Sequence, residues 1–238
     1  MKLKTLYILI LSAIFVVICV IMVASFSDIA TLTSKEISAD DNPVIIVDAG
    51  HGGEDGGAEA DGTLEKDINL AISRRVADIL RLSGYTVKEV RTEDISIYSD
   101  DAETLREKKV SDLKNRVALF NESSNHIAVS IHQNKFNSAK YHGTQVFYSS
   151  KHPDSMNLAK AIQTSVVMLL QNDNTRELKS AGEDIYILRN AEVPAVIVEC
   201  GFLSNPEERA KLTEDEYQQE IAYAIAMGTM DYCQQKKD

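Results

Sequence analysis

Three short apolar stretches in this chain each lead into a histidine or a glutamate. Val44 to Val47 precede His51, Ile127 to Ile131 precede His132, and Ala195 to Val198 precede Glu199. Stretches of this length that are rich in Val and Ile are typical of strands buried on both faces of a parallel sheet. In open α/β sheets, ligands bind beyond the carboxyl ends of the strands. The three polar side chains are therefore predicted to meet at one rim of a sheet.

The rest of the body alternates between strand and helix patterns. Further strands are expected over Tyr85–Val90, Gly143–Tyr148 and Asp184–Leu188. Helices are expected over Leu64–Leu82, around Leu105 to Phe120, over Ser155–Leu170 and over Thr213–Tyr232. This order predicts an α/β fold with a mostly parallel twisted sheet and helices on both faces. The length is enough for one good-sized core, so residues 43–238 are expected to form a single catalytic domain.

The N-terminus carries a long apolar segment that predicts export of the body. Lys2 and Lys4 precede 21 uncharged residues from Leu6 to Phe26, which as a helix would extend about 31 Å, the thickness of a bilayer's hydrocarbon core. Basic residues before the span and acidic residues after it keep the N-terminus in the cytoplasm. Residues 1–26 are therefore either a signal anchor, which their length favours, or a signal peptide cut near Ser25-Phe26-Ser27.

The charge of the exported part excludes several classes of partner. Residues 27–42 are polar and without apolar periodicity, so they are expected to form a linker. Of the 25 basic residues only Lys2 and Lys4 lie within residues 1–26, and none of the 36 acidic residues does, so the exported part has 23 basic residues against 36 acidic ones and a formal charge of −13. Such a charge repels nucleic acid and anionic membrane surfaces. Contact with a membrane is expected only through the N-terminal segment.

A fourth polar residue, Glu65, lies 14 residues after His51 and opens the first predicted helix. Taken alone, a Glu in a first helical turn usually complements the helix dipole, and a single His after a strand is usually a satisfied polar residue. Two histidines and two carboxylates converging on one rim are instead typical of catalytic zinc, which keeps one coordination position open to water. We therefore predict that one Zn²⁺ per chain is bound here.

Glu199 differs from the other three because it follows a stretch of Val and Ile, where an ionised carboxylate needs a partner or a chemical task. If zinc takes His51, Glu65 and His132, Glu199 is free to accept a proton from the activated water and to pass it to a leaving nitrogen. Cys200 should face the other side of the sheet, because successive side chains of a strand alternate. We expect Cys200 to pack in the core.

Three motifs of the chain together resemble the zinc-dependent N-acetylmuramoyl-L-alanine amidases of bacterial cell-wall turnover, the amidase-3 family. They are VDAGHGG at Val47–Gly53, SIHQN at Ser130–Asn134 and PAVIVECGFLSN at Pro194–Asn205. The similarity runs from about Pro43 to Tyr232. It implies that the substrate is peptidoglycan, and that the enzyme cuts the amide between N-acetylmuramic acid and the L-alanine of the stem peptide.

The same resemblance implies the roles of the four rim residues. His51, Glu65 and His132 match the family's zinc ligands, and Glu199 matches its catalytic carboxylate. The family usually continues its second histidine motif as His-Ala-Asn, whereas this chain has Gln133 in the middle position. That variant, together with the short body and the N-terminal segment, resembles the germination-specific spore-cortex branch, which makes the substrate for muramic-δ-lactam formation.

The stretch between His132 and Glu199 contains no long inhibitory insert of the kind some relatives carry. Regulation by a partner protein that activates or localises the enzyme is therefore expected. A vegetative cell-wall autolysin of the same chemistry, a peptidoglycan deacetylase and a non-catalytic wall-binding module stay open as alternatives. The absence of an H-E-x-x-H motif argues against a zinc peptidase, and the presence of all four rim residues argues against an inactive module.

Three further polar residues are candidates for substrate binding. Asn134 follows His132 closely and is expected either to hydrogen-bond the substrate or to cap its loop. Arg91 follows the strand that ends at Val90 and is expected either to meet a stem-peptide carboxylate or to pair with a neighbouring acid. Arg189 follows Leu188 in a similar position, so it is expected to face the same rim.

Overall fold

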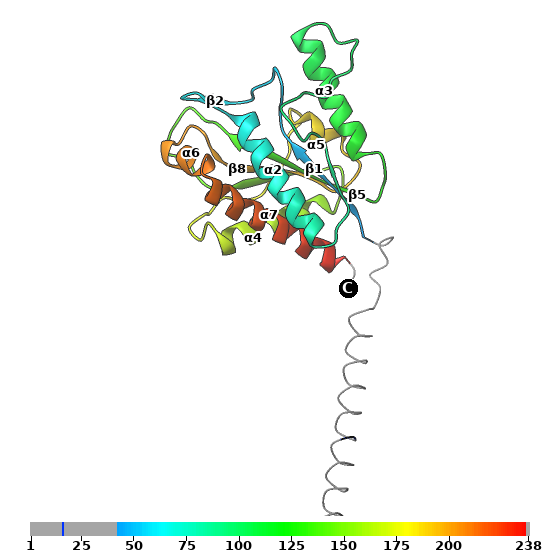
Figure 1. The fold of residues 1–238 in the computed structure, drawn as a ribbon, viewed down its shortest axis with the longest axis vertical. Coiled ribbons are helices and arrows are strands. Elements are labelled where there is room, and N and C mark those ends of the chain that lie inside the picture. Colours follow the sequence, from blue (N-terminus) through cyan, green and yellow to red (C-terminus); the bar gives the residue numbers. More distant parts are fainter. Residues whose placement is uncertain (1–15, 17–41, 237–238) are drawn as a thin grey trace, which may run out of the picture. The chain divides into compact units, whose positions relative to one another are not determined.

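The computed structural model describes residue 16 and residues 42–236 (Figure 1). The predicted N-terminal segment and most of the linker therefore lie outside the described residues. Among the described residues, no helix is long and apolar enough to cross a membrane.

The body is built on a six-stranded sheet with the strand order β4-β1-β5-β8-β6-β7. β4, β1, β5 and β8 run parallel to one another, whereas β6 runs antiparallel to β8 and parallel to β7. A small separate hairpin is formed by β2 and β3. The strands are β1 (Val44–Ala49), β2 (Glu59–Ala60), β3 (Thr63–Leu64), β4 (Val87–Glu89), β5 (His126–Asn134), β6 (Gln145–Tyr148), β7 (Lys179–Ser180) and β8 (Ala195–Phe202).

The helices divide into two groups. α2 (Glu65–Leu82), α4 (Ser155–Leu169) and α7 (Asp215–Gln235) pack together, and α3 (Leu105–Phe120) and α5 (Tyr186–Asn190) lie apart from them (Figure 1). A short helix, α6 (Pro206–Leu212), follows β8 and begins with the side-chain cap of Asn205. The predicted fold class, a mostly parallel sheet with helices on both faces in a single domain, is confirmed.

Strand residues alternate between two cores, as the pleat of a sheet requires. Ile45 and Val47 pack against α2, whereas Ile46 between them packs in the core under α3 and α5. Ile131 belongs to the α2 side, so His132 faces the side of α3 and α5. In β8, Ile197 lies on the α3 and α5 side. The residue parity of both central strands thus directs their polar side chains to the same face of the sheet.

Some predicted boundaries were wrong. Residues 184–188 do not form a strand; the segment contains α5, which buries Ile187 and Leu188 and leaves Arg189 exposed. Over five residues an apolar pattern cannot separate a period of 2 from one of 3.6. The sheet edge is formed instead by β7, which the sequence did not indicate.

Candidate metal centre and catalytic carboxylate

The turn after β1 brings two histidine rings together. His51 adopts a left-handed backbone conformation with φ of 62°, which is uncommon for a residue with a side chain. Gly52 and Asp55 close the turn with two main-chain hydrogen bonds of 3.0 and 3.1 Å. A Cβ atom at Gly50 would lie 2.2 Å from Nε2 of His132. Glycine at that position is therefore what lets the ring of His132 approach, and the two ring centroids lie 5.0 Å apart.

Two buried arginines, Arg91 and Arg116, support this turn through hydrogen bonds to its main-chain carbonyls. Arg91 donates through Nε to the carbonyl of Ala49 at 2.9 Å and through Nη2 to that of Gly50 at 3.0 Å. Arg116 donates to the carbonyls of Ala49 and His51 at 2.8 and 2.7 Å. The carbonyls of a tight turn would otherwise be left without partners in a dry interior, which is costly.

The predicted substrate contact of Arg91 does not fit this position. Its side chain is 3% exposed, and it also donates to the carbonyls of Glu93 and Lys66 at 3.0 and 2.8 Å. Because four of its donors are bound to main-chain oxygens, Arg91 supports the turn rather than facing the rim. The sequence placed it correctly after a strand, but its burial under the turn could not be inferred from that spacing.

Arg116 is the centre of a buried charge network. It contacts Asp48 and Asp112, and Asp48 also accepts a hydrogen bond of 2.6 Å from Ser130. Burial disfavours its charge, but the two carboxylates outweigh that effect and raise the pKa of Arg116 above its ordinary value. Asp48 is completely buried, so the pair fixes the end of β1 against α3.

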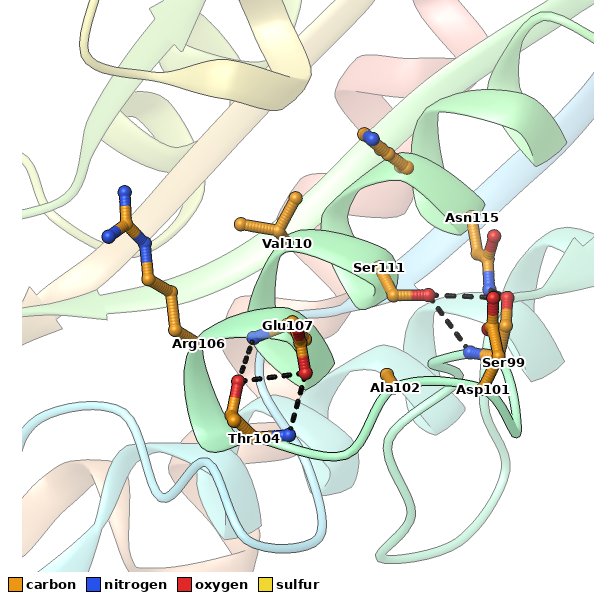
Figure 2. A pocket seen from close by; sticks show the side chains of 10 residues that line it. Ser99, Asp101, Ala102, Thr104, Arg106, Glu107, Val110, Ser111 and Asn115 are labelled. Atoms are coloured by element: carbon orange, nitrogen blue, oxygen red, sulfur yellow. Dashed lines mark hydrogen bonds between the residues drawn. The ribbon is translucent and has the colours of Figure 1, made fainter.

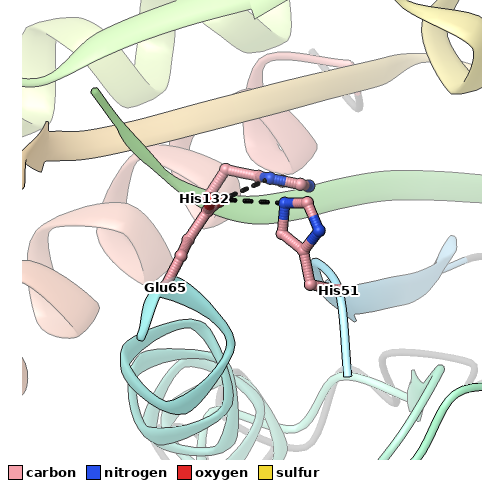
Figure 3. Close-up of side chains that lie close together, drawn as sticks. All are labelled: His51, Glu65 and His132. Carbon is pink, nitrogen blue, oxygen red and sulfur yellow. Dashed lines mark hydrogen bonds and ion pairs between the residues drawn. The ribbon is translucent and has the colours of Figure 1, made fainter. Parts of the chain in front are cut away.

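Glu65, the first residue of α2, lies between the two rings (Figure 3). Its Oε2 is 3.3 Å from Nε2 of His51, and its Oε1 is 2.9 Å from Nδ1 of His132. Main-chain N–H groups of Ala58 and Gln133 donate to the same carboxylate at 2.8 and 3.1 Å. The carboxylate is thus fixed by the hairpin on one side and by β5 on the other.

The electrostatics of the cluster follow from these contacts. Burial alone would raise the pKa of Glu65, but the hydrogen bonds from His132 and His51 hold it well below its usual range. Burial alone would lower the pKa of His51, but hydrogen bonds to Asp55 and Glu65 raise it from 6.5 to about 9. The hydrogen bond from His51 keeps the pKa of Asp55 below its ordinary value.

The three predicted metal ligands are brought together. His51, Glu65 and His132 each offer one donor atom, and these atoms lie within 4.8 Å of one another. Zinc bonds of 2.0–2.2 Å would separate tetrahedral donors by roughly 3.3–3.6 Å, close to the 3.3 Å between His51 and Glu65. Two imidazoles and one carboxylate are a donor set that zinc accepts. The residues therefore fit a divalent cation such as zinc.

Glu199 lies beside this cluster on the neighbouring strand. Its Cα pairs in register with that of His132 across β5 and β8, and adjacent strands are about 4.8 Å apart. One of its carboxylate oxygens, Oε2, is buried without a hydrogen-bond partner. Burial, together with the nearby charge of Glu65, raises the pKa of Glu199 to about 7. An unpartnered carboxyl with such a pKa is suited to accepting and releasing a proton near neutral pH.

Cys200 confirms the predicted alternation along β8. Its side chain is completely buried in the core on the α2 side, and burial raises the pKa of its thiol above the ordinary value. A thiol that stays protonated is a poor nucleophile. Both central strands also continue past the residues expected to end them, β5 to Asn134 and β8 to Phe202.

A pocket of about 270 Å³ opens over the cluster. One end is lined by the candidate ligands His51 and His132 and by Glu199. Much of the remaining wall comes from α3 and from the segment around α5, and includes Lys109, Asp112, Leu113, Arg116, Asp184, Ile185, Tyr186 and Ile187. A substrate with its scissile bond at the cluster would extend along this wall.

The other candidate residues lie as follows. The carbonyl of Asn134 accepts a 2.8 Å hydrogen bond from the N–H of Leu203, at a register shift of β5; its substrate contact stays a prediction. Arg189 is in the last turn of α5, where it donates to the carbonyl of Glu183 at 3.1 Å and lies over the ring of Tyr186. Its predicted position at a strand end was wrong, because that strand is a helix.

Asp55 is a site residue that the sequence analysis missed. Its Oδ2 lies 2.9 Å from Nδ1 of His51, and its Oδ1 accepts from the N–H of Gly57 at 3.2 Å. Metal-binding histidines usually give their second ring nitrogen to such a carboxylate. The only signal in the sequence was its place four residues after His51 in the same glycine-rich turn.

A wider hollow of about 640 Å³ lies beside the N-terminal end of α3 (Figure 2). Its polar groups mostly bind one another. Thr104 and Glu107 form a reciprocal cap, and Ser111 bonds to the N–H of Ser99 at 2.9 Å. None of the four predicted catalytic and metal residues lines it, so size alone does not identify the functional site.

Comparisons with known proteins agree with this geometry. A family model described as N-acetylmuramoyl-L-alanine amidase (Amidase_3) matches residues 45–230. The germination-specific N-acetylmuramoyl-L-alanine amidase of Bacillus subtilis is 36% identical over 195 residues, which cover 82% of this chain and 81% of that protein.

Two solved structures are similar over nearly the same range. The CwlD amidase from Clostridioides difficile, solved in complex with the GerS lipoprotein, superposes with a TM-score of 0.77 and 41% identity, covering 83% of this chain and all of that one. An N-acetylmuramoyl-L-alanine amidase from Clostridium difficile 630 superposes with a TM-score of 0.72 and 31% identity, covering 82% and 99%.

Proposed function

Because this chain belongs to the amidase-3 family and is a peptidoglycan amidase of the N-acetylmuramoyl-L-alanine type, we propose that it works with one zinc ion held by His51, Glu65 and His132, and with Glu199 as its catalytic carboxylate. The observation that carries this proposal is the convergence of three donor atoms within 4.8 Å beside a buried carboxylate oxygen without a partner. Such a zinc ion supplies Lewis-acid activation of water and of the scissile carbonyl.

Side chains of the protein transfer the proton, orient a metal ligand and exclude water. Glu199 accepts a proton from the attacking water and delivers it to the nitrogen of L-alanine as the amide bond breaks. Asp55 orients the ring of His51 through Nδ1, which leaves Nε2, the nitrogen next to Glu65, to hold the metal. The apolar wall of the pocket, with Leu113 and Ile187, keeps bulk water away from the reacting bond and thereby strengthens the electrostatic interactions in the site.

Incubation of purified peptidoglycan with the zinc-loaded protein tests this function. Mass spectrometry should find stem peptides with a free N-terminal L-alanine and glycan strands with bare lactyl groups. Release of acetate would support a deacetylase instead, and an unchanged polymer with retained protein would support a wall-binding module. The Glu199→Gln protein is the matched control, since it should bind zinc and the polymer without releasing peptides.

We further propose a role in maturation of the spore cortex, where removal of stem peptides precedes formation of muramic-δ-lactam. The similarity to the germination-specific enzyme of Bacillus subtilis supports this role, as does Gln133 in the second histidine motif. Spores of a strain that lacks the protein should contain cortex without muramic-δ-lactam, while the walls of growing cells stay unchanged. Altered walls in growing cells alone would indicate a vegetative autolysin.

We also propose that the protein is exported and that it acts with a partner protein. The sequence of residues 1–26 supports secretion or anchoring at the outer face of the cell membrane, followed by a linker at 27–42 and the catalytic domain at 43–238. The similar amidase of Clostridioides difficile was solved with a lipoprotein, which supports an activating or localising partner protein here. Alkaline extraction of membranes separates an anchored protein from a secreted one.

A further inference from the structure

The pocket over the metal centre contains one cationic side chain that is accessible to a ligand. Two cationic residues, Arg116 and Lys109, line it. Arg116 has a side chain only 2% exposed and is held by Asp48 and Asp112, whereas the side chain of Lys109 is 58% exposed. Lys109 is therefore the cationic side chain that an anionic group of a ligand would meet at this wall of the pocket.

The ammonium group of Lys109 is not tightly bound within the protein. Its Nζ lies 3.4 Å from Oδ2 of Asp55, and that oxygen is already 2.9 Å from Nδ1 of His51. Charge-assisted hydrogen bonds are normally about 2.7–2.9 Å long. By comparison, the Lys66–Asp94 pair is 2.6 Å long. Lys109 thus keeps donors available for a bound molecule.

The position of Lys109 relative to the metal centre matches the reach of a short peptide. Its Nζ is linked to the ring of His51 through the single carboxylate of Asp55. An extended residue spans at most about 3.3–3.6 Å, so one or two residues beyond the scissile bond bring a side group to this wall. Of the acids that line the pocket, Asp48 and Asp112 are paired with Arg116 and Asp55 with His51. The exposed acid, Asp184, comes from the segment before α5, so a substrate anion is favoured near Lys109 rather than near α5.

We propose that Lys109 binds a carboxylate of the stem peptide on the residue that directly follows the released L-alanine, which is the second residue beyond the scissile bond. This inference rests on the proposed function, because the stem peptide of peptidoglycan carries D-glutamate as its second residue. Its α-carboxylate is free in some walls and amidated in others. Lys109 would therefore let the enzyme distinguish free stems from amidated ones.

The chain offers a matched control on the same helix. Lys108 is the neighbouring residue of α3, but it lies 3.1 Å from Oε2 of Glu54 and over the ring of Tyr98. It does not line the pocket over the metal centre. Lys108→Met removes the same charge from α3 as Lys109→Met and leaves the pocket unchanged.

The test measures binding of two peptides to the full chain carrying Glu199→Gln, which prevents turnover. The probes are N-acetyl-L-alanyl-γ-D-glutamyl peptides that differ only in a free or amidated α-carboxylate, and calorimetry gives both dissociation constants. Without a change at Lys109, the free acid should bind about five- to tenfold more tightly than the amide, as a partly exposed ion pair allows. Lys109→Met should abolish this preference by weakening only the free acid, and Lys108→Met should preserve it.

Two results would overturn the proposal. In one, Lys109→Met weakens the binding of both peptides equally, which would show that the residue acts only through Asp55. In the other, Lys109→Met changes the dissociation constant of neither peptide. The proposed function is tested separately. Wild-type protein that releases no stem peptides from peptidoglycan would refute the amidase activity, whereas the calorimetric preference between the two peptides would still be measured.

Discussion

The two faces of the sheet are built on different principles. The face under α2, α4 and α7 is covered by helices of 18, 15 and 21 residues and contains a continuous apolar core. The face under α3 and α5 has one helix of 16 residues and one of 5. Its interior holds the Arg116 network, the turn of His51 and the pocket. One face supplies stability by burial, whereas the other leaves room for chemistry.

This difference explains how the candidate site comes to lie on the less covered face of the sheet. Residue parity in β5 and β8 sends His132 and Glu199 to the less covered face. Glu65 reaches the same place from the N-terminal end of α2, where it contacts the carboxyl-terminal part of β5. The turn of His51 is then fixed by two arginines rather than by apolar packing.

The largest expected effect is on catalysis at the less covered face. Glu199→Gln should lower kcat by about 10³-fold or more, because general acid–base catalysis contributes up to about 10⁴ and the amide cannot take up the proton. Zinc stoichiometry by atomic absorption should stay at one per chain. Retention of most of the rate would show that Glu199 is structural.

A second pair of variants compares the two faces directly. Arg116→Met should lower the free energy of unfolding by about 3–5 kcal/mol, because it leaves the buried Asp48 without its partner, and it should weaken zinc binding by releasing the turn of His51. Ile72→Ala, on the buried face of α2, should cost about 2–5 kcal/mol with zinc affinity unchanged. Urea unfolding and competition with a zinc chelator measure both. Equal loss of zinc affinity in the two variants would contradict the division between the faces.

A smaller effect is expected from the carboxylate behind His51. Asp55→Ala should weaken zinc binding about 10- to 100-fold, as loss of such a hydrogen-bond partner usually does. The control is Glu122→Ala, which removes an exposed carboxylate paired with Lys88 and should leave the zinc affinity unchanged. Equal affinities for the Asp55 and Glu122 variants would show that the hydrogen bond to His51 does not support the ligand.

A rise in pH should lower the stability of the zinc-free protein but raise the affinity of the protein for zinc. The pKa of His51 is raised to about 9, so its bound proton stabilises zinc-free protein most fully below about pH 6.5, and this contribution is lost as the pH rises to about 9. Zinc must displace that proton, so zinc affinity should rise by about tenfold per pH unit from 6 to 8. Thermal melts in chelator and zinc titrations at matched pH measure both trends. A zinc affinity that does not change over this range would contradict the assignment of His51 as a ligand.

Much of the fold and the centre of the site could be predicted from sequence, because periodicity and strand ends carry that information. The strands before His51 and Glu199 follow from their continuous apolar stretches, and the burial of Cys200 follows from alternation along a strand. Contacts that depend on how separate loops fold over one another could not be predicted. Arg91 was expected at the rim and is buried under the turn.

The incorrect prediction of a strand before Arg189 has a different cause. The segment around Arg189 was too short for its pattern to separate a strand from a single helical turn. Asp55 and Lys109 were missed because each acts through a neighbour in space, one on the turn after β1 and the other on α3. No spacing in the sequence relates residues of these two elements.

The most direct test of the account is a zinc titration of the wild-type chain beside His132→Ala and His142→Ala. His132 lies within the candidate metal centre, whereas His142 lines a different pocket. We expect one tightly bound zinc per chain in the wild type and in His142→Ala, and none in His132→Ala. Stoichiometric zinc of unchanged affinity in the His132 variant would contradict it.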